Sequence, residues 1–332
     1  MTEAVPQLSP PVPTVLPWRC ALTICAAALG LGVAGYDVTG SAGSMAATAG
    51  FSVGLFAALS GGLRAALIAG LGFICVVGLV LALPVLPVVL ALCVALSVVA
   101  AVEGAQVGTR ISVMVLLGVM LFAIATERGS DVRMLGLATL GLAGGYLVTA
   151  HLRMSSILRP PRVNRAEAVR LAVFLSVGIA LSIGLAMSIN LPHASCLMPH
   201  AYWIVILFVS RCLMPMQDKF GALLKYGHGA ALGVAAAVLI ELAGTPDAWR
   251  LLLALAAFAL GLRFLPHPRP ISAAAMTAGL LLVSAPTPTE ATFRIEAVFL
   301  AIALILFLTL MLERVVPKLV GAHATKPAGK DR

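Results

Sequence analysis

Long apolar runs separated by short polar segments dominate this sequence, and that feature decides the class of protein. Hydrophobic residues make up 61% of the 332 residues and charged residues only 11%, whereas a soluble domain carries about 25% charged residues. The mean hydropathy is +1.07. A soluble core cannot absorb this much apolar surface, and one membrane span needs about 20 mostly apolar residues. The sequence therefore predicts an all-α polytopic membrane protein without a soluble domain, whose first partner is the lipid bilayer.

The apolar runs between polar segments number about twelve, and each predicts one transmembrane helix. We expect these helices at residues 19–36, 42–60, 64–83, 85–103, 110–126, 133–151, 169–190, 199–216, 221–241, 248–264, 270–286 and 294–314.

The placement of Lys and Arg predicts the orientation, because cytoplasmic loops hold most basic residues. With the N-terminus inside, 18 of the 22 basic residues fall on the cytoplasmic side. Only Arg128, Arg133, Arg250 and Arg294 fall outside. Both termini are therefore predicted to be cytoplasmic. The net charge of +9 indicates membrane orientation, and no nucleic-acid partner is expected, because no basic face with interleaved aromatic residues lies outside the predicted spans.

The two halves of the chain match each other at a shift of 161 residues, which predicts a duplication. Arg64 then coincides with Lys225, and Gly72 with Gly233. At the first helices the shift is 151 residues, so the second half has gained about ten residues before its second helix. We predict a disordered tail at 1–18, a six-helix repeat at 19–151, a basic cytoplasmic linker at 152–168, a second six-helix repeat at 169–316 and a basic cytoplasmic tail at 317–332. An even number of spans per half makes these parallel repeats, which by analogy favours a transporter.

Each half resembles the membrane module of the FUSC family, the fusaric-acid-resistance and aromatic-acid-exporter proteins. The resemblance covers most of 165–316 and, more weakly, 17–155. It rests on Arg170, the stretch Pro-His-Ala-Tyr-Trp at 199–203, Lys225, and the pair Gly229 and Gly233. It implies an exporter of small, often aromatic, organic acids in the bacterial inner membrane, commonly working with a periplasmic adaptor protein.

The first half departs from the family pattern, because Ser41 and Ala42 occupy the positions that match Tyr202 and Trp203. The chain also lacks the large soluble domain of many family members. The substrate and the coupling ion therefore stay open. Alternatives are a transporter of the major-facilitator or drug/metabolite type, or a non-transporting membrane subunit of an adaptor-containing efflux system. A homo-oligomer is a further expectation.

Two histidines and two aromatic residues gather at the predicted entry of the eighth helix. His193 and His200 are candidates to bind or protonate a carboxylate, and Tyr202 and Trp203 to stack on its ring. Tyrosine and tryptophan also form ordinary belts at membrane interfaces, where wetted loop histidines are common, so both interpretations stand.

Three basic residues are candidates to attract an organic anion: Arg64 and Lys225 at matching helix ends, and Arg211 in the short eighth helix. The alternative role is a positive-inside anchor for Arg64 and Lys225, and an ion pair with Asp218 for Arg211. Small residues four apart, at Gly50 and Gly54 and at Gly229 and Gly233, predict helix-packing surfaces.

Metal, cofactor and catalytic motifs are not recognisable in the sequence. The six cysteines form no Cys-x-x-Cys pair and no cluster with zinc spacing, so we expect neither disulfides nor a metal. Serine hydrolase and metalloprotease motifs are missing as well. We therefore expect no enzyme activity and no cofactor.

Overall fold

Helices make up the architecture throughout the residues that the computed structural model describes. These residues are 15–83, 86–106, 111–127, 131–157, 164–190, 204–205, 208–209, 219–264, 270–284 and 296–312. The labelled helices are α1 (Trp18–Ala82), α2 (Leu86–Gln106), α3 (Ile111–Glu127), α4 (Arg133–His151), α5 (Arg165–Asn190), α7 (Lys219–Leu242), α8 (Asp247–Arg263) and α9 (Pro270–Ser284). A further helix spans Glu296–Leu312. Within the described ranges there is no strand, which confirms the predicted all-α class.

Four of these helices are long and apolar enough to cross a membrane. They are Trp18–Ala82, Pro87–Gln106, Arg133–His151 and Glu167–Leu185. Large apolar side chains also point outward from them: Leu71 of α1 is 67% exposed and Leu147 of α4 is 62% exposed. Apolar surface on this scale needs an apolar solvent. Both features fit a membrane-embedded protein.

The helix α1 is 65 residues long but is not one straight rod. Its backbone leaves the helical region at Thr39 and Gly40 and again at Gly62. These two breaks divide it into three segments, which hold the predicted runs 19–36, 42–60 and 64–83. The long element therefore folds back on itself, and its segments can pack as separate helices.

The helix α5 begins at Arg165, ahead of the predicted start at 169, because its first turn is capped. The Glu167 amide donates to the Asn164 side chain at 2.8 Å, and the Asn164 amide donates to the Glu167 carboxylate at 3.3 Å. This reciprocal pair is a capping box, which satisfies two amides that a helix start otherwise leaves open.

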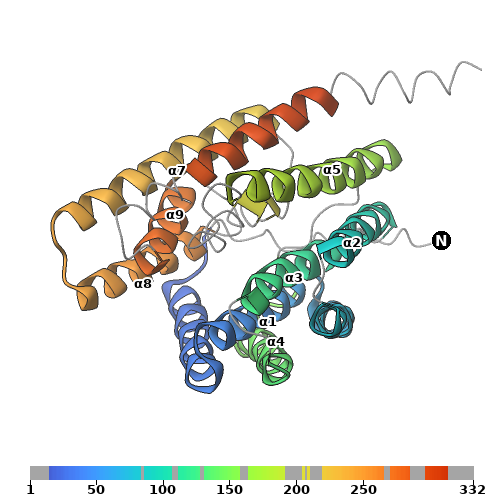
Figure 1. The fold of residues 1–332 in the computed structure, drawn as a ribbon. Helices are drawn as coiled ribbons and strands as arrows, with labels where there is room; N and C mark the ends of the chain where they lie inside the picture. The colour runs from blue at the N-terminus through green and yellow to red at the C-terminus, as the bar shows by residue number, and fades with distance from the viewer. Residues whose placement is uncertain are drawn as a thin grey trace, which may run out of the picture.

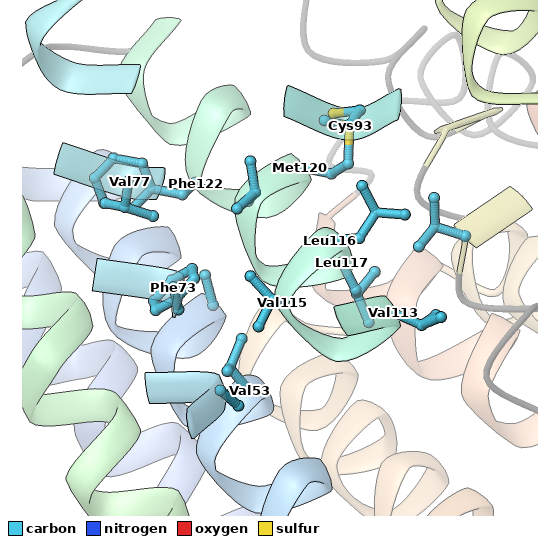
Figure 2. Close-up of a cluster of buried hydrophobic side chains, with 14 of the residues drawn as sticks. Val53, Phe73, Val77, Cys93, Val113, Val115, Leu116, Leu117, Met120 and Phe122 are labelled. Carbon is cyan, nitrogen blue, oxygen red and sulfur yellow. The ribbon is translucent and has the colours of Figure 1, made fainter. Parts of the chain in front are cut away.

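The main core surrounds α3, as Figure 2 shows for its labelled side chains. Residues from α1, such as Phe73 and Val77, and Cys93 of α2 contribute to the same buried cluster. The rings of Phe73 and Phe122 meet edge to face with 6.5 Å between centroids. None of the exposed large apolar residues in the described chain belongs to α3. The helix is therefore enclosed by its neighbours and does not line the outer surface.

The two halves of the chain occupy different sides of the molecule in Figure 1. Within the first half α1 packs on α3 and α4, and within the second half α9 packs on α7 and α8. Between the halves, the labelled helices meet as two pairs, α2 with α5 and α1 with α8. These two pairs are the main contacts between labelled helices of the two halves.

Candidate functional site

The first break in α1 creates a polar site inside an apolar helix. Gly40 has a φ of +66°, in the left-handed region that favours glycine, and no atom lies within 4 Å of where its Cβ would be. Backbone conformation, and not lack of space, is therefore what requires glycine here. The Thr39 hydroxyl is buried and has no hydrogen-bond partner among the described residues. The break thus places an unpaired hydroxyl where one helical segment ends and the next begins.

Close backbone contact folds the chain at this break. A Cβ on Gly35 would lie 2.7 Å from the carbonyl carbon of Gly43, and a Cβ on Gly43 would collide with the Gly35 carbonyl oxygen. Only glycine on both sides allows this approach. The neighbouring Asp37 is exposed. Residues 37–43 therefore combine polar backbone groups with two hydroxyl side chains, Thr39 and Ser41, and one carboxyl group.

The second break in α1 is supported by the turn that follows α4. Gly62 has a φ of +71°, and its Cβ position lies 3.1 Å from the hydroxyl oxygen of Ser156. The Ser156 amide donates to the carbonyl oxygen of Ala58 at 2.9 Å. Arg64 is exposed just after the break, and Arg153 is exposed in the supporting turn. Arg64 therefore lies two residues after Gly62, which contacts the turn that carries Arg153.

All four aromatic and histidine candidates and one basic candidate lie outside the described residues: His193, His200, Tyr202, Trp203 and Arg211. Lys225 belongs to α7, but its side chain also lies outside the description. The structure therefore does not test whether these residues share a site. Ile204 and Val205, which directly follow the Tyr-Trp pair in the sequence, are buried, at 1% and 0% exposed.

The four glycines that the sequence singles out lie at helix contacts. A Cβ on Gly50 would lie 2.7 Å from the backbone carbonyl carbon of Ala138, and one on Gly54 would lie 2.9 Å from that of Leu142. In the second half, Gly229 faces Pro270 and Gly233 faces Ala274, each with 2.9 Å to the carbonyl carbon. A real Cβ does not approach backbone this closely, so glycine permits each approach.

The reciprocal glycines on α4 were missed in the sequence. A Cβ on Gly141 would lie 2.9 Å from the backbone nitrogen of Phe51, and one on Gly145 would lie 2.5 Å from that of Leu55. Their four-residue spacing is the signal that could have found them. Glycines from both helices therefore form one interface between α1 and α4.

The carboxylate of Glu103 has a structural role at a helix start. The two carboxylate oxygens of Glu103 accept hydrogen bonds from the amides of Ile111 and Ser112, at 2.8 and 2.9 Å. A carboxylate at a helix N-terminus satisfies open amides and complements the helix dipole. Glu103 therefore fixes the start of the enclosed helix α3, a role that the sequence did not indicate.

A second charged cluster joins α7 to α8. The Arg250 guanidinium lies 2.9 Å from the Asp247 carboxylate and 3.5 Å from that of Glu241. The Arg250 side chain is 17% exposed and that of Glu241 28%, so this pair is partly screened from water, whereas Asp247 is 84% exposed. Within the described residues no group of three or more His, Cys, Asp or Glu is placed to hold a metal ion.

The comparisons with known proteins add no assignment to this geometry. The chain matches no family model, no curated protein and no solved structure.

Proposed function

We propose that the chain is a secondary transporter of the bacterial inner membrane, related to the FUSC family, that exports small aromatic organic acids. The observation that carries the proposal is the way the two halves meet. Matching the repeats by sequence relates the first segment of α1 to α5 and relates α2 to α8. The contacts of α1 with α8 and of α5 with α2 are then the same contact made twice. This favours two parallel repeats of six helices, about twelve spans in all and both termini in the cytoplasm.

The burial of two matching helices supports the same arrangement. A shift of 161 residues relates 111–123 of α3 to 272–284 of α9. In α9 the side chains between Ser272 and Leu282 are buried or half-buried, as they are along α3. Repeated halves with enclosed helices at matching positions are typical of membrane transporters, whose substrate sites lie between the repeats.

The broken helix of the first half supports the location of the substrate site. The break at Thr39 and Gly40 directly precedes Ser41 and Ala42, which match Tyr202 and Trp203 in the second repeat. Interrupted helices at matching positions of two repeats expose backbone groups that bind substrate in transporters. We place the aromatic acid between these two helix entries.

The chemistry proposed for the second entry follows from its residue types. Tyr202 and Trp203 would stack on the ring of the acid, and His200 or His193 would bind or protonate its carboxylate. Lys225, Arg64 and Arg211 would draw the anion toward the membrane.

Flux into proteoliposomes that contain only this chain tests the proposal directly. We expect uptake of a radiolabelled aromatic carboxylate, lost in His200→Ala and Lys225→Ala and strongly reduced in Trp203→Ala. Trp249→Ala is the matched control, because Trp249 is 61% exposed at the start of α8 and is not among the residues proposed to bind the acid.

Two further results separate the alternatives. Flux that appears only after addition of a co-purifying protein would favour a subunit of an adaptor-containing system. Absence of flux for a panel of aromatic acids, together with unchanged tolerance of a deletion strain, would refute the exporter.

A further inference from the structure

The start of α1 is fastened to the end of α8 by a side-chain contact. The guanidinium carbon of Arg263 lies 4.6 Å from the ring centroid of Trp18. Arg263 is the last residue of α8, and Trp18 is the first residue of α1. A guanidinium over an indole ring is attracted by the negative face of the ring. This cation–π pair therefore joins the first half of the chain to the second.

A main-chain hydrogen bond reinforces the same junction. The amide of Leu16 donates to the carbonyl oxygen of Arg263 at 2.7 Å. The last carbonyls of a helix have no partner within the helix, so this bond satisfies one of them. Leu16 itself is 1% exposed and packs in a cluster with Cys20 and Ile24. The residues ahead of α1 thus serve as a cap for a helix of the other half.

The two repeat-equivalent contacts differ in the size of the side chains that fill them. The side of α5 that joins the main core carries Leu175 and Ile179, both fully buried. The fully buried side chains between α1 and α8 are Ala21, Cys25 and Ala259, and Leu255, Phe258 and Leu262 pack against them half-buried. Fully buried Leu and Ile remove more apolar surface from water than fully buried Ala and Cys, so we infer that the contact of α1 with α8 is the weaker seam of the two.

We propose that the pair of Trp18 and Arg263 is a latch that holds this seam closed, and that the halves separate along it while α2 and α5 stay packed. The proposal concerns the conformations of the chain and stands whether or not the chain transports aromatic acids. It predicts that weakening the latch exposes the seam without loosening the core.

Two native cysteines report on the two regions. Cys25 lies in the seam and is 6% exposed, and Cys93 lies in the main core and is 0% exposed. The full-length protein in lipid nanodiscs would be pulsed with N-ethylmaleimide, and the labelling rate of each cysteine would be read by peptide mass spectrometry. Maleimide reaches Cys25 only when the seam opens.

We expect Trp18→Ala and Arg263→Gln each to speed labelling of Cys25 by about two- to fivefold, the equilibrium factor that one exposed cation–π contact supplies. Labelling of Cys93 should not change. The double variant should match the single variants, because each already removes the same contact. Arg263→Lys, which keeps a cation, should lie between the wild type and Arg263→Gln.

Trp249→Ala is the matched control, since it removes an exposed tryptophan from the other end of α8. Equal Cys25 rates in the wild type and both latch variants would overturn the proposal. So would a parallel rise at Cys25 and Cys93, which would mean general loosening, or an equal rise in Trp249→Ala. None of these readouts depends on transport, so failure of the proposed function leaves the test intact.

Discussion

Replacing Gly50 by alanine tests whether the backbones of α1 and α4 are as close as only glycine permits. The new Cβ would lie 2.7 Å from the carbonyl carbon and 3.0 Å from the Cα of Ala138, and would overlap its carbonyl oxygen. Backbone atoms of a packed helix cannot move aside as the end of a flexible side chain can. The two helices must therefore separate, and overpacking of this kind costs about 1–3 kcal/mol.

Gly30→Ala, in the same helix, is the control that separates the cost of the clash from the effect of helix propensity. Gly30 is exposed, and no atom lies within 4 Å of its Cβ position. Alanine in place of glycine inside a helix gains about 1 kcal/mol from propensity alone, and both variants receive this gain. The difference in free energy of unfolding between Gly50→Ala and Gly30→Ala therefore isolates the clash, at about 1–3 kcal/mol.

Equilibrium unfolding in mixed detergent micelles, followed by circular dichroism, would measure this difference. We expect Gly50→Ala to unfold at lower denaturant and Gly30→Ala at the same or higher denaturant than the wild type. If the two variants are equally stable, the close approach of α1 and α4 is wrong.

Three further changes probe a helix cap, a surface ion pair and a buried ring. Glu103→Gln leaves one of the first two amides of α3 without its carboxylate acceptor, and we expect a loss of about 1–2 kcal/mol in the same unfolding assay; unchanged stability would refute the cap. The Arg133 side chain and amide, by donating to Asp131, hold the pKa of that carboxyl below its ordinary value. The stabilisation from this pair is thus fully present above about pH 4 and is lost as the pH falls through the lowered pKa. Carboxyl NMR titration should show the pKa of Asp131 rising in Arg133→Gln, and an unchanged titration would contradict the pairing. Phe208 is 0% exposed and stacks on a phenylalanine ring of α5 with 5.1 Å between centroids, so Phe208→Ala should cost about 3–5 kcal/mol. Phe299→Ala, at a 53% exposed ring, should cost much less, and equal losses would refute the burial of Phe208.

Apolar runs predict helices well in this chain because length and composition alone decide whether a segment can span a bilayer. The predicted run 133–151 coincides with α4, and the run 270–286 with α9 to within two residues. The start of α5 was placed too late, since the capping box of Asn164 and Glu167 lies in a segment that composition marks as a polar linker.

The site is less predictable, because its geometry depends on which helices meet. The Gly50 and Gly54 spacing indicates a packing surface, but only the fold identifies α4 as the partner. Glu103 stands in the sequence as an acidic residue at the end of a span, and its role comes from the first amides of α3, which donate to it. Trp18 and Arg263 are 245 positions apart, and no local pattern relates them.

The sequence by itself determined that the chain is helical and built for a membrane, since hydropathy and the 20-residue length of a span are local properties. The breaks at Gly40 and Gly62 came from the structure, where both glycines have the left-handed backbone that glycine adopts without strain. Only the tertiary structure decided that α3 is enclosed, that α1 meets α8 while α2 meets α5, and that Trp18 lies against Arg263. The physical reason is that helix pairing depends on how well the surfaces of two helices fit, and the residues that form these surfaces are distant in the sequence. Apolar helices of similar composition do not show in their own sequence which helix they will pack against.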